Sequence, residues 1–210
     1  MGIEEIIAKM IQDVGIDAPQ QVLPEPDMVS FLRLEKSRKY YIDSGIDGSI
    51  MALQRKILLC NQEDLGKSID KRQPITIYIM SPGGCIDFMY MLIDTILLSQ
   101  TPVYTVNIGC AASAAALIFL AGHKRFMMPR ARILIHEGSA ALEGDAGKVM
   151  DAADTYKKDI KRMKDFILER TGIPKALMSK KHSNDWSLTA QECLEYNVCD
   201  RIIESLDEIA

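Results

Sequence analysis

Residues 107–122 read NIGCAASAAALIFLAG, and they place a single hydroxyl, Ser113, inside a run of small and apolar side chains. The run is shorter than the ~20 residues that a membrane-spanning helix needs. It overlaps the stretch PVYTVNIG at residues 102–109, which has the composition of a strand. We therefore expect a buried strand that turns into a helix close to Ser113.

The same alternation of strand and helix precedes this stretch. KYYID (39–43) and PITIYIM (74–80) have the composition of strands, and each is followed by a segment that reads as a helix, at residues 48–63 and 85–100. Strands that alternate with helices favour a parallel sheet with crossover helices. The sequence therefore predicts an α/β fold.

The strongest helix signal runs from about Gly147 to Arg170, where apolar residues recur every three or four positions and charged residues fill the other face. The stretch TGIP follows, so we expect Gly172 to form a left-handed cap and Pro174 to prevent continuation. Near the end of the chain, TAQE at residues 189–192 predicts a capping box.

Length and composition indicate one globular domain with a short leading segment. The chain has 210 residues, of which 48% are hydrophobic and 26% are charged. Residues 18–27 contain three prolines and few apolar residues, which is typical of an extended linker. We expect an N-terminal helix and linker over residues 1–28 and a single domain over residues 29–210.

Charge and cysteine content exclude several classes of function. The net charge of −4 comes from interspersed acids and bases, so nothing indicates nucleic acid or an anionic membrane as a partner. The five cysteines are odd in number and form no C-x-x-C pair, which argues against a disulfide framework and a zinc site. This cysteine usage fits a reducing cytoplasm best, so we expect a cytoplasmic protein. The first residues lack the basic start and long apolar stretch of a secretory signal.

Ser113 occupies a position that suits a nucleophile. Where a strand ends and a helix begins, backbone N–H groups are free and the positive end of the helix dipole is close. The alternative is that Ser113 only caps the helix, as serine commonly does. A catalytic serine needs a base, and His136, which ends the strand-like ARILIH, is better placed than His123 or His182, which are flanked by charges.

Two further features complete a possible acyl-transfer site. Asp185 precedes the single tryptophan, and a loop that this aromatic residue holds down could present the carboxylate to a histidine. The glycines of SPGG (81–84) would let the backbone approach a substrate closely, although the same motif is also common in ordinary turns.

Four ordered motifs resemble the proteolytic subunit of the Clp protease, a family with the Clp/crotonase fold. The resemblance runs from about Arg38 to Ile203, and the motifs that carry it are YIMSPGG, GCAASAAA, RILIHEG and LTAQECLEYNVCDRII. It implies repeated strand-strand-helix units with a protruding helical handle. It also implies the nucleophile Ser113, the base His136, the orienting Asp185, and oxyanion donors at the backbone N–H groups of Gly84 and Ala114.

The resemblance further implies an activity and its partners. We expect a serine endopeptidase that cleaves unfolded polypeptides without metal or cofactor, inside a chamber of two stacked heptameric rings. A Clp-type AAA+ ATPase unfoldase would feed the chamber by docking flexible loops into apolar pockets between neighbouring subunits on the outer ring face. The positions that match the family's docking pocket are Tyr78, Val106, Ile108, Phe126, Met128 and Ile203, although Val106 and Ile108 also suit an ordinary strand core.

This chain departs from the family pattern in three places. His136-Glu137-Gly138 stands where many members have H-Q-P, Asn184 stands where many have arginine, and the leading segment does not match the usual axial-pore sequence. The first two lie in or near the region that joins the rings in relatives, so we expect a divergent or phage-type member with altered ring contacts.

Two other functions remain open at this stage. A crotonase-type acyl-CoA enzyme shares the fold, but it usually relies on a Glu or Asp base and needs no Ser-His pair. A catalytically silent ring subunit would be expected to lose part of the triad, whereas Ser113, His136 and Asp185 are all present.

Overall fold

The computed structural model of the chain describes residues 26–181 and 185–209. The chain divides into two units, Met1–Ser37 and Arg38–Ala210. The described part of the first unit contains helix α2 (Pro26–Lys36), which includes the last two residues of the predicted linker. Proline suits the first turn of a helix because it has no N–H to satisfy there. The helix predicted at the start of the chain lies outside the described residues.

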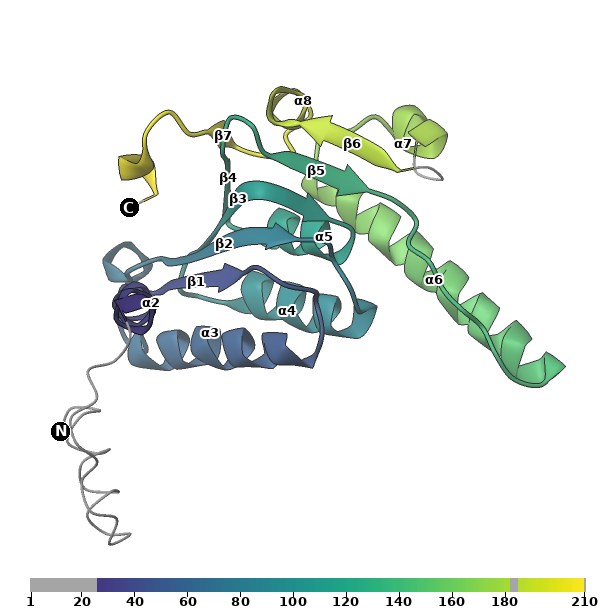
Figure 1. Cartoon of the computed structure of the whole chain (residues 1–210), viewed down its shortest axis with the longest axis horizontal. Coiled ribbons are helices and arrows are strands. Elements are labelled where there is room, and N and C mark those ends of the chain that lie inside the picture. Colours follow the sequence, from purple (N-terminus) through teal and green to yellow (C-terminus); the bar gives the residue numbers. More distant parts are fainter. Residues whose placement is uncertain (1–25, 182–184, 210) are drawn as a thin grey trace, which may run out of the picture. The chain divides into compact units, whose positions relative to one another are not determined.

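A single sheet organises the unit Arg38–Ala210 (Figure 1). Within the described ranges its seven strands are β1 (Lys39–Ile42), β2 (Ile75–Ser81), β3 (Val103–Ala112), β4 (Lys124–Met127), β5 (Arg132–Ile135), β6 (Trp186–Thr189) and β7 (Arg201–Ile202). Strands β1-β2-β3-β4-β7 are neighbours in that order and run parallel. The predicted α/β class is confirmed.

On the side away from β2, strand β3 pairs with two neighbours, one after the other along its length. Residues 104–107 pair with β4, and residues 110–112 pair with β5, again in parallel. Strand β6 then pairs with β5 in the antiparallel direction. The sequence patterns did not predict β6 or the two-residue β7. Because residues 110–112 pair with β5, the end of β3 that leads directly into Ser113 has β5 beside it.

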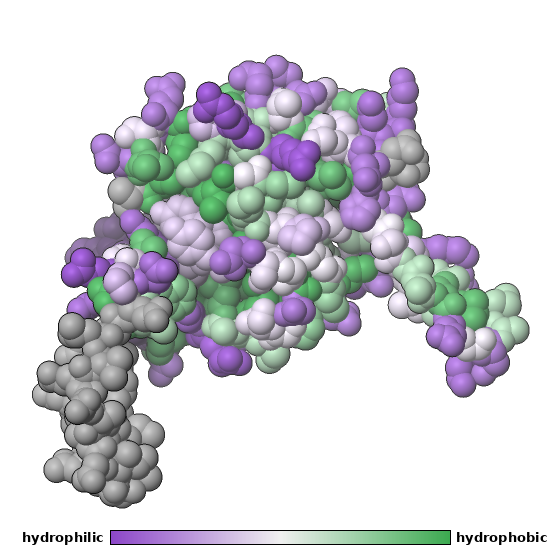
Figure 2. Space-filling model, in the orientation of Figure 1, coloured by the Kyte–Doolittle hydropathy of each residue, from purple (hydrophilic) through white to green (hydrophobic). Residues whose placement is uncertain are grey.

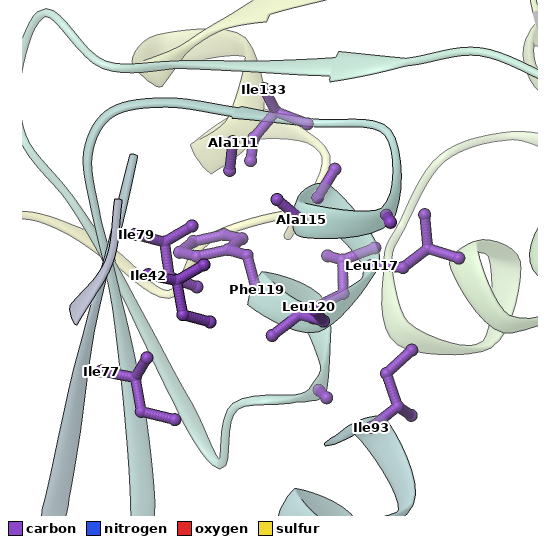
Figure 3. Close-up of a cluster of buried hydrophobic side chains, with 14 of the residues drawn as sticks. Ile42, Ile77, Ile79, Ile93, Ala111, Ala115, Leu117, Phe119, Leu120 and Ile133 are labelled. Carbon is purple, nitrogen blue, oxygen red and sulfur yellow. The ribbon is translucent and has the colours of Figure 1, made fainter. Parts of the chain in front are cut away.

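Three helices cover one face of this sheet, namely α3 (Met51–Glu63), α4 (Ile86–Leu98) and α5 (Ala114–Ala121). Figure 3 shows Phe119 of α5 among the isoleucines of the strands, such as Ile79. Every residue of α5 is buried, which explains why this short helix is apolar on all sides.

Helix α6 (Ala146–Arg170) is the predicted handle. Its 25 residues correspond to a length of about 37 Å. Only Met163 and Ile167 of this helix are buried, and both lie in its C-terminal half. The N-terminal half extends away from the sheet (Figure 1) and begins at the cap Asp145, whose side chain accepts the N–H of Lys148.

The end of α6 differs from the prediction. The cap residue is Thr171 in an extended conformation, and Gly172 is not among the glycines with positive φ. Instead, the N–H of Gly172 donates to the Tyr196 carbonyl at 2.6 Å, and a Cβ at this position would lie 3.3 Å from the same oxygen. The predicted left-handed cap is therefore wrong. Glycine at this position instead allows the backbone of residue 172 to lie close to the backbone of Tyr196.

Short elements complete the chain, namely α7 (Lys175–Lys181), α8 (Ala190–Glu195) and the 3₁₀ turns η1 (Gly48–Ile50), η2 (Ile69–Lys71) and η3 (Leu206–Glu208). The predicted capping box is confirmed, because the Thr189 hydroxyl accepts the N–H of Glu192 and the Glu192 carboxylate accepts the N–H of Thr189. Within the described ranges, no helix has the length and apolar character needed to cross a membrane.

A buried ion pair ties the start of the unit Arg38–Ala210 to the end of α3. The side chain of Asp64 is 1% exposed, and its oxygens accept from Arg38, Lys67 and Thr101. The guanidinium of Arg38 also donates to the Gln73 carbonyl at 3.0 Å. These donors hold the pKa of Asp64 well below its ordinary value, with the hydrogen bond from Arg38 as the largest cause.

Asp64→Asn is expected to lower the free energy of unfolding by about 3 kcal/mol, because it leaves Arg38 buried without its main counter-charge. A carboxyl whose pKa is depressed in the folded state adds stability above its unfolded pKa, about 3.9, and that stability is lost as the pH falls. Urea unfolding between pH 7 and pH 3 should therefore show a flatter pH dependence for Asp64→Asn than for the parent. The exposed Asp70→Asn is the matched control, and equal stability of both variants would contradict the prediction.

Candidate active site

Ser113 lies at the junction of β3 and α5 in an unusual backbone conformation. Its φ of 55° and ψ of −125° fall in a region that costs a residue with a side chain roughly 1–3 kcal/mol. Backbone hydrogen bonds hold it there. Its N–H donates to the Leu134 carbonyl at 2.9 Å, and its carbonyl accepts the N–H groups of Ala116 at 2.9 Å and Leu117 at 3.4 Å. Such strain is common at functional sites, where the surrounding structure maintains it.

The hydroxyl of Ser113 is not used as a helix cap. Ser113 occupies the N-cap position of α5, but its side chain accepts no capping hydrogen bond. The capping role that serine frequently plays therefore does not explain this residue. The side chain instead lines a pocket.

The glycine turn after β2 packs against this junction. Gly83 has φ 94°, and a Cβ there would lie 2.6 Å from the Ala112 carbonyl oxygen and 2.7 Å from the Cβ of Ser113. Gly84 has φ 153°, and a Cβ there would overlap the backbone of Ile46. Both positions therefore require glycine, because any side chain would push the turn away from Ser113.

Two backbone N–H groups at this junction remain available to a ligand. The N–H of Gly83 donates to the Ser81 hydroxyl, and that of Cys85 donates to the Ile46 carbonyl. Among the residues that the structure describes, no acceptor is bonded to the N–H of Gly84 or Ala114. These are the two donors that the family resemblance implies, and both residues line the Ser113 pocket.

His136 reaches the same pocket from β5. The parallel register pairs Ala112 with Leu134, so the residues that follow each strand end, including Ser113 and His136, lie at the same edge of the sheet. The Nδ1 atom of His136 accepts the N–H of Gly138 at 3.2 Å. Its side chain is 25% exposed and therefore accessible from the pocket.

Asp185 is brought opposite His136 by the antiparallel pairing of β5 and β6. Ile135 pairs with Trp186, which places the residue before Trp186 next to the residue after Ile135. Trp186 is 8% exposed and contacts Tyr196 edge to face, so the aromatic residue holds this strand down as expected. The Oδ1 atom of Asp185 lies 4.0 Å from His136 Nδ1, which is longer than a hydrogen bond, and the carboxylate is 77% exposed.

The pocket itself has a volume of about 290 Å³. Polar groups gather at Ser113 and His136, while Ile86, Met89 and Met163 provide an apolar lining. Sequence reasoning did not identify these three residues as part of a site. Their spacing on helices gives the same signal as ordinary core residues, so only the tertiary contact distinguishes them.

His123 does not take part in this pocket. His123 follows α5, and its Nδ1 accepts the N–H of Val103 at the opening of β3. Ser113 follows the other end of this ten-residue strand, about 30 Å away at the usual rise per residue. His182 lies outside the described residues.

A second apolar group, here called the Tyr78 cluster, lies on the opposite face of the sheet. Ile77 and Ile79 join the core under the helices, so Tyr78 between them points to the other face. The cluster contains all six residues that match the family's docking pocket, and one that the sequence did not indicate: Tyr78, Val106, Ile108, Phe126, Met128, Ile203 and Ile209.

A serine and a histidine in one pocket at the carboxyl ends of a parallel sheet are typical of acyl-transfer hydrolases. Comparison with known proteins identifies the class more closely. The model of the Clp protease family matches residues 27–206. The chain therefore belongs to the Clp protease family.

Two curated relatives agree with this assignment. One is the ATP-dependent Clp protease proteolytic subunit 2 of Treponema denticola, which is 35% identical over 147 residues that cover 69% of this chain and 74% of the relative. The other is the protein of the same name from Corynebacterium diphtheriae, which is 32% identical over 176 residues that cover 82% and 85%. The predicted serine protease class is confirmed, and the silent-subunit and acyl-CoA alternatives are not favoured.

Proposed function

We propose that this chain is a serine endopeptidase in which Ser113 is the nucleophile, His136 the general base and Asp185 the residue that orients the base. The observation that carries the proposal is the pocket that joins Ser113, His136 and the N–H groups of Gly84 and Ala114, for which the described part of the chain provides no acceptor. A pocket with these groups contains each part that acyl transfer requires.

The reaction follows from these positions. The Ser113 hydroxyl attacks a peptide carbonyl while the Nε2 atom of His136 takes its proton, and the imidazolium then protonates the leaving amine. The N–H groups of Gly84 and Ala114 donate to the oxyanion, and removing one such donor typically costs 10²–10³-fold in kcat. Water then attacks the acyl enzyme with His136 again as the base.

The described geometry corresponds to a resting arrangement. Because Nδ1 of His136 accepts from Gly138, the neutral imidazole carries its proton on Nε2, where it cannot accept the serine proton. Catalysis requires Nδ1 to exchange Gly138 for the carboxylate of Asp185, which is 4.0 Å away. Catalytic hydrogen bonds often tighten only when substrate binds.

The pocket lining favours apolar substrate side chains. Ile86 and Met89 come from α4, and Met163 comes from the buried part of α6. These side chains carry no charge, so we expect a mild preference for apolar residues and no requirement for a particular sequence.

Labelling with a fluorophosphonate probe tests the nucleophile directly. The probe should modify the protein at a single residue, and peptide mapping should place the adduct on Ser113. Labelling of a different serine, or no labelling under conditions that support peptide cleavage, would contradict the assignment.

We further propose that the chain assembles into heptameric rings, stacked in pairs, which a Clp-type AAA+ unfoldase supplies with unfolded polypeptide. The names of both relatives describe proteolytic subunits of an ATP-dependent protease. The Tyr78 cluster is the proposed docking site for the unfoldase. All five cysteines are free thiols, which suits a reducing cytoplasm.

The handle is the proposed contact between rings. Figure 2 shows hydrophobic surface, in green, among polar residues on the projecting part of the molecule. Met150 on α6 is 69% exposed and Leu142 just before the helix is 41% exposed, so both are available to a second ring.

The double ring is expected to be labile. Gly138 and Asn184 replace residues that lie in or near the ring-joining region of relatives, and Asn184 lies outside the described residues. Sedimentation velocity should therefore show single rings, or a double ring that separates as the salt concentration is raised. A double ring that persists at high salt would refute this expectation.

A further inference from the structure

The Tyr78 cluster lies on a face of the sheet that the helices α3, α4 and α5 leave open. The strand register aligns Tyr41, Tyr78, Val106 and Phe126 in one row across β1, β2, β3 and β4. Tyr41 stacks on Tyr78 with ring centroids 4.9 Å apart. The row therefore presents a continuous apolar surface, and any segment that lies on it will be held by side-chain contact.

A segment of the same chain already lies on this surface. Ile209 is 8% exposed and packs with Tyr78, Val106 and Ile203 in the cluster. The hydroxyl of Tyr78 donates to the carbonyl oxygen of Ile209 at 2.9 Å. These residues are 131 positions apart in the sequence, so the contact is tertiary and does not follow from local structure.

The turn before Ile209 directs it onto the cluster. The carboxylate of Glu208 accepts the N–H groups of Glu204 and Ser205 at 2.8 and 3.0 Å, and it also pairs with Arg201 at 2.6 Å. Ser205 in turn caps η3 by accepting the N–H of Asp207. The segment is thus a turn, stabilised by its own hydrogen bonds and ion pair, that returns the chain to the sheet.

The contact defines the chemistry of a ligand. It consists of one aliphatic side chain among apolar neighbours and one backbone carbonyl that accepts from Tyr78. We propose that the segment Ser205–Ile209 is an internal occupant of the docking site, and that the apolar loop of the unfoldase binds by displacing Ile209 and taking its hydrogen bond from Tyr78. This inference rests on the docking site proposed above.

Displacement is feasible because few interactions hold Ile209 itself. One side chain and one hydrogen bond attach it to the cluster, and its N–H donates to the Leu206 carbonyl at 3.1 Å within the turn. The Glu208 interactions also belong to the turn and survive if Ile209 leaves. Leu206 in the same turn is 65% exposed and takes no part in the cluster, so it provides a matched control.

A labelled peptide tests the occupancy without any unfoldase. The probe is fluorescein-ESLDEI-amide, which copies residues 204–209, and its binding to the full chain is followed by fluorescence anisotropy. Ile209→Ser should bind this probe about tenfold more tightly than the parent. If Ile209 fills the site nine-tenths of the time in the parent, only about one-tenth of the sites are free, and the apparent affinity is lower by about tenfold. Leu206→Ser should bind it like the parent, and circular dichroism confirms that each variant is folded.

Adding Tyr78→Phe to Ile209→Ser should weaken probe binding, since the carbonyl of the probe loses its donor. Equal probe binding by the parent and Ile209→Ser would overturn the proposed occupancy. If Leu206→Ser binds the probe as much more tightly than the parent as Ile209→Ser does, the proposed occupancy is also overturned, because a loosened turn would explain the tighter binding of both variants.

A second assay separates this inference from the docking proposal. A Clp-type unfoldase and ATP are added with a folded, tagged substrate, and the unfoldase concentration at half-maximal degradation is measured. We expect this concentration to fall in Ile209→Ser and degradation to be lost in Tyr78→Ala. The unfoldase is also added to the probe-binding assay as a competitor. If Ile209→Ser binds the probe more tightly but the unfoldase does not displace the probe, the docking proposal fails while the internal occupancy stands. If Tyr78→Ala abolishes degradation but Ile209→Ser leaves the half-maximal concentration unchanged, the displacement inference fails while the docking site stands.

Discussion

Ser113→Ala is expected to lower kcat for peptide cleavage by roughly 10⁶-fold and to abolish fluorophosphonate labelling, because the hydroxyl is the proposed nucleophile. Alanine keeps the Cβ atom, so the strained φ of 55° is no worse in the variant than in the parent. The loss would therefore report the hydroxyl and not a collapse of the junction between β3 and α5. Assembly, measured by sedimentation velocity, should be unchanged.

Ser139→Ala is the matched control for this experiment, because Ser139 lines the same pocket and is the other serine there. It should keep both the labelling and most of the cleavage. Unchanged turnover in Ser113→Ala, or loss of labelling only in Ser139→Ala, would show that the nucleophile has been assigned to the wrong residue.

His136→Ala is expected to cost about as much as the loss of Ser113, since a serine without a base stays protonated. Asp185→Asn should cost somewhat less, on the order of 10⁴-fold, because asparagine holds the imidazole in the wrong tautomer. The double variant Ser113→Ala/His136→Ala should be no slower than either single variant, because the two residues act as a unit. Steady-state cleavage of a short fluorogenic peptide measures all three.

His123→Ala is the control for the base, because His123 bonds the backbone at the opposite end of β3 from Ser113. It should retain cleavage close to that of the parent. If His123→Ala or His182→Ala were the damaging change, the base has been misassigned. Full activity of Asp185→Asn would mean that His136 is oriented by another group, such as the N–H of Gly138.

The alternation of strands and helices could be read from the sequence because it depends on local periodicity. The apolar run of α5, the long amphipathic pattern of α6 and the capping box at Thr189 each lie within one element. Strand β6 was missed because only two of its four residues, Trp186 and Leu188, are apolar, whereas three of four are apolar or aromatic in the equally short strands β1 and β5. The cap at Gly172 was wrongly assigned because the reason for that glycine is a contact with Tyr196 from a distant turn.

The sequence by itself determined the α/β class and marked Ser113 and His136, because a residue that ends a strand or begins a helix is identified by its immediate neighbours. Only the tertiary structure decided that Asp185 faces His136, that Gly83 presses against Ser113, and that Ile209 returns to Tyr78. Those contacts depend on the register between strands and on where long connections close. Neither is encoded in local periodicity, since a strand pairs equally well in several registers until side-chain packing on both of its faces selects one.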